Sequence, residues 1–365
     1  MLVSIALPVY NAQEFLDECF ESILKQNRST DDQGQASKIN DTEEKTETVF
    51  SVEVSVYDDG STDSSPSLID KWAKTFGSTQ GFSFRLSKND TGSPKGVGFA
   101  RNETIRQSTG DYICFCDADD IMDPNRISAQ LKLNMLHPEA IIGSKFRRLP
   151  ADSTRSFTCW ANSLTERQLQ TQIYMTFGPT IVMPTWFCHR RVYDRVEGGF
   201  NESGKGTPED LIFFYKHLDQ NGKVARVDQE LVIYRYHSSA TTFSVTDEII
   251  RNIRLERMES KVLNSWNKFS IWNAGKLGRR FYRSLSPQTR QKVTCLCDVD
   301  KKKITQKWYH PHPIKEKVSI VHVKDASPPF VICVKTEITW DPTGDFRMLL
   351  DSLNLEEGVD YYYFN

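Results

Sequence analysis

Long hydrophobic runs are missing from this 365-residue chain, and so is a strong excess of charge of either sign. No run approaches the roughly 20 apolar residues that a membrane helix needs. The opening stretch MLVSIALPVYNAQEF reaches Pro8 and Asn11 too early to be a signal peptide. A formal net charge of -2 creates no field that would attract nucleic acid or an anionic membrane. We therefore expect a cytoplasmic protein with no membrane span and no nucleic-acid partner.

Cysteine pairs with the spacing of a zinc site are also missing. Five of the eight cysteines lie in apolar, strand-like runs, where a thiol usually packs as a small hydrophobic group: Cys114, Cys116, Cys295, Cys297 and Cys333. This usage is typical of a reducing compartment. The length and the hydrophobic content of 38% are those of an ordinary globular protein with two domains.

Strand-like and helix-like patterns alternate along the first part of the chain. An apolar run at 2–7 precedes a helical pattern, and the further strand-like runs are VFSVEVSVYDDG, FSFRLSK and DYICFCDADD. Alternation of this kind predicts a mostly parallel sheet covered by helices on both faces. The polar stretch 27–48 lacks periodicity, and we interpret it as a mobile insertion. We predict a first domain over 1–245, a helical linker over 246–268 and a smaller domain over 269–365.

Polar residues follow several of these predicted strands. They are the turn from Pro8 to Asn11, the pair Asp58 and Asp59, the loop around Lys95, and the segment CDADD. Because ligands of open α/β sheets bind outside the carboxyl ends of the strands, these features are expected to share one site. Adjacent carboxylates at a strand tip are costly unless a polar or cationic group meets them. The alternative for Asp58 and Asp59 is a turn in which they bind nearby backbone amides.

Asp117, Asp119 and Asp120 form a carboxylate cluster at the end of the apolar strand YICFC. Clustered carboxylates repel one another, and a hard divalent cation such as Mn²⁺ or Mg²⁺ relieves that repulsion. The alternative is a solvated turn whose aspartates cap the helix that follows.

The segments PVYN, DDGSTD, ARN, DADD and PED occur in this order along the chain. This order resembles that of the family 2 inverting glycosyltransferases of the GT-A fold, over roughly residues 1–245. The resemblance implies a GT-A domain, with a Rossmann-like and mostly parallel sheet, followed by a small Rossmann-like C-terminal domain. It also implies metal-assisted transfer of a sugar from a UDP-sugar to the hydroxyl of an unknown acceptor, with N-acetylglucosamine as the candidate sugar. No Q-x-x-R-W pattern follows YRYH, which favours transfer of single sugars over processive synthesis.

On the donor side, the resemblance assigns Asp59, with Asp58 beside it, to the nucleobase. The other residues that it implies for nucleotide-sugar binding are Pro8, Tyr10, Asn11, Arg101, Asn102 and Asp117. Arg101 and Asn102 lie in a helix that follows a glycine-containing turn, where backbone N–H groups and positive charge suit a diphosphate. Arg101 is equally compatible with a solvated helix face, and Lys95 with an ordinary surface charge.

For the metal, the resemblance implies Asp119 as a ligand, Asp120 as a supporting residue and His237, in YRYH, as a further contact. It implies Asp210 as the catalytic base, and we place Glu209 and Trp186 on the acceptor side. Helix capping alone would also explain Glu209 and Asp210, because both lie just inside a predicted helix start, after Pro208. Core packing would explain Trp186, and an ordinary polar role would explain His237.

The C-terminal segment FSIWNAGKLGRRFYRSL predicts a strand, a turn with Gly275 and Gly278, and a helix. The next strand ends at Asp298, so the block resembles half of a dinucleotide-binding unit, although Asn273 replaces the first glycine. The block either binds a nucleotide or small effector, or serves a structural or docking role. Two other functions therefore stay open: a sensor or oxidoreductase-like protein that uses this unit, and a catalytically silent nucleotide-sugar-binding scaffold.

Overall fold

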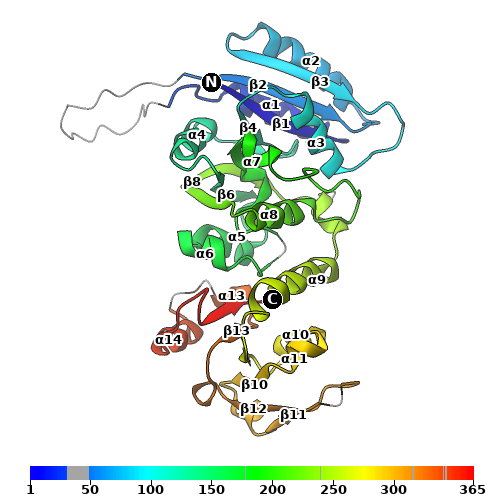
Figure 1. Ribbon diagram of the computed structural model, residues 1–365. Coiled ribbons are helices and arrows are strands. Elements are labelled where there is room, and N and C mark those ends of the chain that lie inside the picture. The colour runs from blue at the N-terminus through cyan, green and yellow to red at the C-terminus, as the bar shows by residue number, and fades with distance from the viewer. Residues whose placement is uncertain (31–48, 177, 239, 315, 340, 342) are drawn as a thin grey trace, which may run out of the picture. The chain divides into compact units, whose positions relative to one another are not determined.

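The computed structural model describes residues 1–30, 49–176, 178–238, 240–314, 316–339, 341 and 343–365 (Figure 1). Two compact units divide the chain. The first consists of residues 1–154 and 181–245, and the second of residues 155–180 and 246–365. The segment 155–180, which we had placed in the first domain, therefore belongs to the second unit. Most of the predicted insertion, residues 31–48, lies outside the described residues.

The first unit is built on one eight-stranded sheet with the order β3-β2-β1-β4-β7-β6-β8-β5. Strands β1 to β4 pair in parallel, as do β6 and β8, whereas β7 and β5 run antiparallel to their neighbours. Its elements are β1 (Leu2–Val9), α1 (Leu16–Leu24), β2 (Ser51–Asp58), α2 (Ser65–Ser78), β3 (Phe82–Lys88), α3 (Val97–Gln107), β4 (Tyr112–Phe115), β5 (Ile121–Met122), α4 (Arg126–Leu136), β6 (Ala140–Leu149), η1 (Met183–Thr185), β7 (Phe187–His189), α7 (Arg190–Asp194), α8 (Glu209–Asp219), β8 (Lys223–Arg235) and η2 (Thr241–Ser244).

Apolar side chains from strands and helices form the core of the first unit. Strands β1 and β2 are buried along nearly their whole length, as expected for parallel strands covered on both faces. Helix α1 buries Leu16, Phe20 and Ile23, and the Phe20 ring lies 5.7 Å from that of Trp72 in α2. Helix α3 lies in the crossover that joins β3 to β4, and it packs on β1 and β2.

The register of these strands brings their carboxyl ends to one edge. Val9 in β1 is opposite Asp58 in β2, and Ala6 is opposite Phe115 in β4. The carboxylates that follow β2 and β4 therefore emerge on either side of the end of β1. The mostly parallel α/β fold predicted for this part of the chain is confirmed.

The second unit contains a six-stranded sheet with the order β11-β12-β10-β9-β13-β14. All pairs are parallel except β11 with β12, and the order reverses between β9 and β13, as in Rossmann-like sheets. Its elements are α5 (Arg155–Ser163), α6 (Glu166–Thr171), α9 (Asp247–Met258), the π-helix η3 (Glu259–Leu263), β9 (Phe269–Trp272), α10 (Lys276–Ser284), α11 (Pro287–Arg290), β10 (Val293–Asp298), α12 (Lys301–Ile304), β11 (Trp308–Tyr309), β12 (Val318–His322), η4 (Val323–Asp325), β13 (Phe330–Ile332), α13 (Thr336–Thr339), α14 (Asp345–Ser352) and β14 (Tyr361–Tyr363). The predicted Rossmann-like C-terminal fold is confirmed.

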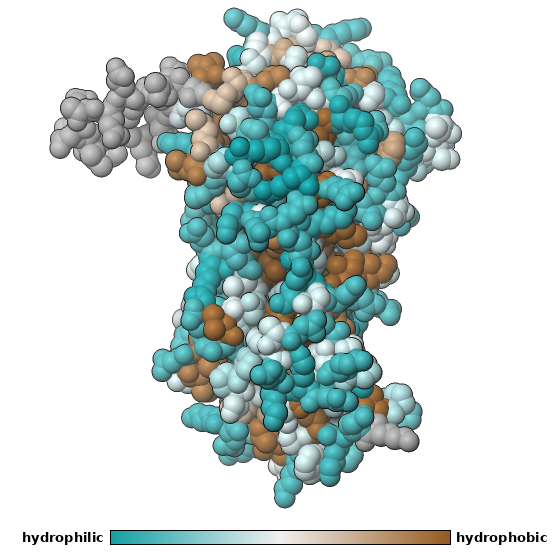
Figure 2. Space-filling view, viewed as in Figure 1, coloured by the Kyte–Doolittle hydropathy of each residue, from teal (hydrophilic) through white to brown (hydrophobic). Residues whose placement is uncertain are grey.

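Hydrophilic residues cover most of the visible face of each unit, and apolar residues there form only small groups (Figure 2). Within the described part of the chain, no helix combines the length and the apolar character needed to cross a bilayer.

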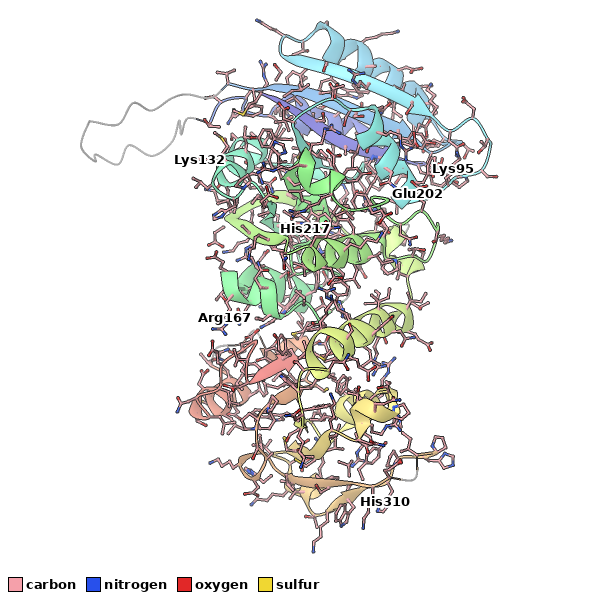
Figure 3. All side chains as sticks on the ribbon, in the orientation of Figure 1. Lys95, Lys132, Arg167, Glu202, His217 and His310 are labelled. Atoms are coloured by element: carbon pink, nitrogen blue, oxygen red, sulfur yellow. The ribbon has the colours of Figure 1, made fainter. Side chains whose placement is uncertain are left out.

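His217 is a buried histidine on α8 that is fixed in one tautomer by two neighbours (Figure 3). Its Nε2 lies 2.8 Å from the carbonyl oxygen of Lys223, and its Nδ1 lies 3.0 Å from an Arg195 nitrogen. Because a guanidinium can only donate, Nδ1 accepts and Nε2 carries the proton. Burial lowers the pKa of His217 to about 4, and Arg195 contributes to the lowering.

This histidine should make the protein sensitive to acid. The unfolded chain takes up a proton at His217 below about pH 6.5, whereas the folded chain resists protonation until about pH 4, so stability falls as the pH drops through this window. The unfolding free energy of the wild-type protein should fall between about pH 7 and pH 5. We expect this fall to be about 2 kcal/mol smaller in His217→Gln. Urea titrations at both pH values measure this. A His137→Gln control, at an exposed position, should keep the wild-type dependence, and an unchanged dependence for His217→Gln would contradict the assignment.

Candidate active site

Asp59 is the first residue after β2, and it holds the next loop in place instead of facing solvent. Its Oδ1 accepts hydrogen bonds from the Asn89 amide and the Lys95 N–H, both at 3.0 Å, and its Oδ2 accepts one from the Gly96 N–H at 2.7 Å. Only 3% of the residue is exposed. Both carboxylate oxygens therefore already accept hydrogen bonds from the protein in this conformation, and the nucleobase contact of Asp59 stays a prediction.

Asp58 precedes it and is equally buried, but it is less fully bonded. Its Oδ1 accepts a hydrogen bond from the Ser61 N–H at 2.9 Å, and within the described residues no hydrogen bond reaches its Oδ2. Asn89, the anchor of Asp59, was not recognised from the sequence. A clue was present, because Asn89 directly follows β3 and so ends at the same edge of the sheet.

The turn after β1 lies beside this pair. Pro8 is half-buried, and Tyr10 is 48% exposed. Asn11 has a positive φ of 49°, and its Oδ1 accepts a hydrogen bond from the Thr62 N–H at 2.8 Å. Residues 8–11 and 58–62 thus form one wall of the rim, with the Tyr10 ring open to a ligand.

The carboxylates of Asp117, Asp119 and Asp120 follow β4 and form a tight cluster. One oxygen from each lies within 4.8 Å of the others. His237 reaches this cluster from the chain beyond β8, with its Nε2 2.7 Å from Oδ2 of Asp119. Residues more than a hundred positions apart in the sequence thus meet in one group of ligand atoms.

The carboxylates of this cluster disfavour one another's charged form. Burial, followed by the charge of Asp117, raises the pKa of Asp119, although His237 opposes the shift. Burial also raises the pKa of Asp120, and Asp119 adds to the effect. Oδ2 of Asp120 is buried, and none of the described residues forms a hydrogen bond with it. An unpartnered carboxylate oxygen among oxygen and imidazole ligands fits a hard divalent cation.

Arg235, at the end of β8, fixes the backbone of this cluster. Its Nε donates to the Asp119 carbonyl oxygen at 2.7 Å, and its N–H donates to Oδ1 of Asp120 at 2.9 Å. Its guanidinium also pairs with Glu18. One signal for this role was present in the sequence, because Arg235 is two residues before His237 at a strand end.

Arg101 on α3 joins the acid cluster to the start of α8. Its guanidinium donates to Oδ1 of Asp117 at 2.8 Å and pairs with Glu209. Burial disfavours the charged guanidinium, but the two carboxylates outweigh this and raise the pKa of Arg101. Glu209 is therefore occupied by an ion pair, and the interpretation that places it on the acceptor side is not supported.

Asp210 is the second residue of α8 and lies next to this ion pair. Its Oδ1 accepts a hydrogen bond from the Leu211 N–H at 2.7 Å. Burial and then the negative charge of Glu209 raise the pKa of Asp210 to about 7, against the opposing effect of Arg101. A carboxylate with this pKa can take up a proton near neutral pH.

The loop before α8 also meets the loop held by Asp59. A Cβ added at Gly96 would lie 3.0 Å from the Cα of Gly204, and Gly96 has a φ of 98°. A side chain at this position would therefore push the two loops apart. Lys95 and Glu202, which flank the contact, lie on the same side of the first unit in Figure 3. The contact connects the strand-end rim at Asp59 with the approach to Asp210.

Asn102 and Trp186 have structural roles that differ from the predicted ones. The Asn102 amide donates to the Phe200 carbonyl oxygen and to Glu202, and its oxygen accepts from Tyr193 and from the Phe200 N–H. Both ends of the side chain are thus used within the protein, and the diphosphate contact of Asn102 stays a prediction. Trp186 is fully buried, with its indole N–H 2.9 Å from the Ile181 carbonyl oxygen. Such a ring has no exposed face on which an acceptor sugar could stack.

In the second unit, both carboxylate oxygens of Asp298, at the end of β10, accept hydrogen bonds. Oδ2 of Asp298 accepts from the Ala274 N–H and from Lys303 Nζ, both at 2.9 Å, and its Oδ1 accepts from two backbone N–H groups. The Asn273 side chain bridges to the Cys333 carbonyl oxygen at 2.7 Å, across the point where the strand order reverses. These contacts support the structural interpretation of this unit over a dinucleotide site.

Comparison with known proteins agrees with this geometry. The model of glycosyl transferase family 2 matches residues 4–196, and the chain belongs to this family.

Two curated relatives are the uncharacterised glycosyltransferase EpsJ of Bacillus subtilis and a poly(ribitol-phosphate) β-glucosyltransferase of Bacillus spizizenii. The first is 26% identical over 66% of this chain and 63% of its own length, and the second is 28% identical over 33% and 15%. The chain thus spans less than two thirds of either relative. Among solved structures, S. aureus TarS 1–349 in complex with UDP-GlcNAc aligns with a TM-score of 0.53 and 15% identity, over 80% of this chain and 84% of that one. The likeness supports the fold.

Proposed function

We propose that this protein is an inverting glycosyltransferase that transfers a sugar from a UDP-sugar to an acceptor hydroxyl. The observation that carries the proposal is the chain of contacts from Asp117 through Arg101 to Glu209. These contacts join the acid cluster to the start of α8, where the candidate base, Asp210, follows Glu209. Family membership over residues 4–196 supports the same activity.

On the donor side, we propose that the nucleotide lies between Tyr10 and the end of β2. Asp58 replaces Asp59 as the candidate hydrogen-bond acceptor for the base, because only Asp58 retains an oxygen without a hydrogen bond among the described residues. Asp117 is the candidate ribose contact. Arg101 could leave one of its two carboxylates to bind a diphosphate oxygen.

Asp119 and His237 would hold a Mn²⁺ or Mg²⁺ ion, with Asp120 and its unpartnered oxygen behind them. When bound, such an ion supplies positive charge to the diphosphate as it leaves. Asp210 accepts the proton of the acceptor hydroxyl. That oxygen then forms a bond to the anomeric carbon as the bond from this carbon to the diphosphate oxygen breaks, and UDP departs with the electron pair. Attack opposite the leaving group inverts the anomeric configuration.

N-acetylglucosamine is our candidate for the transferred sugar. The segments GPTIVMPTWFCHR and IWNAGKLGRRFYRSL resemble those of β-1,3-N-acetylglucosaminyltransferase-like proteins. TarS, whose complex with UDP-GlcNAc is solved, shares the fold. We propose a structural role for the second unit, because Asp298 and Asn273 are already bonded within it.

Metal-dependent binding of UDP tests the donor side of this proposal. We expect UDP to bind at least about tenfold more tightly with Mn²⁺ than with a chelator, since the acid cluster otherwise repels the diphosphate. Asp119→Ala should abolish this difference, as measured by titration calorimetry. Asp111→Ala, at the exposed opposite end of the same strand, serves as the matched control. Equal UDP affinity with and without Mn²⁺ in the wild-type protein would count against the metal site.

A further inference from the structure

Two exposed aromatic rings lie directly after β8, next to His237. Tyr236 is 40% exposed and Phe243 is 55% exposed. Their ring centroids lie 5.6 Å apart in an edge-to-face arrangement. Hydrogen bonds from the Ala240 N–H to the His237 carbonyl oxygen and from the Phe243 N–H to the Ala240 carbonyl oxygen, both at 3.2 Å, turn the chain back so that the rings meet.

The aromatic pair, Tyr236 and Phe243, is connected to both halves of the candidate active site. Tyr236 directly precedes His237, which contacts Asp119. Phe243 directly precedes Ser244, whose carbonyl oxygen would lie 3.5 Å from a Cβ added at Gly206, in the loop that leads to Asp210. The pair is thus next in sequence to the candidate metal ligand, and η2, which carries Phe243, contacts the loop before the candidate base.

Contacts from β6 hold Tyr236 in position. Its N–H donates to the Leu149 carbonyl oxygen at 2.9 Å. The Arg148 guanidinium lies 3.9 Å from the centre of the Tyr234 ring and 5.7 Å from that of Tyr236. Nε of Arg148 donates to Thr154 at 3.0 Å, which fixes the guanidinium beneath these rings. A ring held in this way presents a defined surface at low entropic cost.

We propose that Tyr236 and Phe243 form the binding platform for the acceptor, and that the acceptor is a pyranose sugar. This inference rests on the proposed function. A pyranose has a face of C–H groups that packs on aromatic rings, while its hydroxyls stay free for hydrogen bonds. Trp186 cannot serve this purpose because it is buried, whereas the aromatic pair is exposed at the rim. Aromatic rings discriminate a sugar ring from an open-chain polyol, which has no such face.

Binding of model compounds to the full chain, saturated with UDP and Mn²⁺, tests the platform. The probes are methyl β-D-glucopyranoside, ribitol and n-hexanol, observed by saturation-transfer NMR. We expect the pyranoside to bind through its ring C–H protons, and we expect Tyr236→Ala and Phe243→Ala each to raise its dissociation constant about fivefold. Phe243→Leu, which keeps the apolar area but loses the ring, should weaken pyranoside binding as well. Leu136→Ala, at an exposed position of α4, is the control and should change nothing.

The outcomes separate the platform from the transferase proposal. UDP affinity reports the donor side, so a protein that binds UDP with Mn²⁺ but binds the pyranoside equally well in all variants overturns the platform alone. Preferential binding of n-hexanol that persists in Phe243→Leu would make the pair a plain apolar surface, and preferential binding of ribitol would make the acceptor a polyol. Loss of UDP binding in the wild-type protein would instead refute the proposed function.

Discussion

Asp210→Asn is expected to lower the turnover number for sugar transfer by about 10²- to 10⁴-fold, the usual contribution of a positioned general base. The amide has the shape of the carboxyl group but cannot take up the proton of the acceptor hydroxyl. UDP affinity should change little, because the proposed donor contacts involve other residues. Steady-state kinetics together with calorimetry separate the two effects.

The pH dependence of the wild-type enzyme provides a second readout of Asp210. Burial and the charge of Glu209 raise its pKa to about 7, so the carboxylate is protonated below this pH and cannot act as a base. We therefore expect kcat/KM to rise with pH and to level off above about 7. Asp210→Asn should lose this rise, whereas Asp219→Asn, at the exposed far end of α8, should keep it. A variant at position 210 that retains the wild-type rate would remove Asp210 as the base.

Arg101→Met is expected to have the largest effect on stability, about 3–5 kcal/mol of unfolding free energy. The guanidinium is 5% exposed and is shared by Asp117 and Glu209, so its loss leaves two carboxylates without their partner in a water-poor site. Activity should also fall, and the rise of kcat/KM should move to higher pH, because Arg101 holds down the pKa of Asp210. Urea titrations and pH profiles measure the two consequences.

Two further variants test this explanation of the Arg101 effect. Arg106→Met removes an arginine whose side chain is 59% exposed on the same helix, and exposed ion pairs contribute about 1 kcal/mol or less. Adding Glu209→Gln to Arg101→Met should restore part of the lost stability, since it removes one of the unpaired charges. If the destabilisation of the double variant equals the sum of those of Arg101→Met and Glu209→Gln, the ion pair does not cause the effect of Arg101→Met.

The sequence predicted much of the donor-side rim because local patterns determine where strands end. Parallel strands share one carboxyl edge, so Asp58, Asp117 and Asp119 could be assigned to one site from alternation of strands and helices alone. The contact of His237 with Asp119 could be expected only through the family resemblance, since 118 positions separate the two residues. The alternation of strands and helices in the sequence does not reveal which strands pair with β8.

The predicted contacts that the structure makes less favourable concern residues whose partners come from distant loops. Asp59 and Asn102 carry polar groups that suit a ligand, but backbone N–H and carbonyl groups of residues 95–96 and 200 occupy them. Trp186 lies in an apolar segment, and nothing local distinguishes a ring that is buried from one that is exposed. Phe243 shows the reverse case, because its exposure follows from a turn whose hydrogen bonds a sequence pattern does not reveal.

The sequence by itself determined the strands, the helices and the chemical groups placed at their ends, because hydrophobic periodicity acts over a few residues. Only the tertiary structure decided which of these groups stay open to a ligand. Arg101 is shared between Asp117 and Glu209, Asp120 keeps an unpartnered oxygen, and Asp298 is fully bonded. Each of these outcomes depends on hydrogen bonds between distant segments, and such bonds exist only once the folded backbone brings donors and acceptors within about 3 Å.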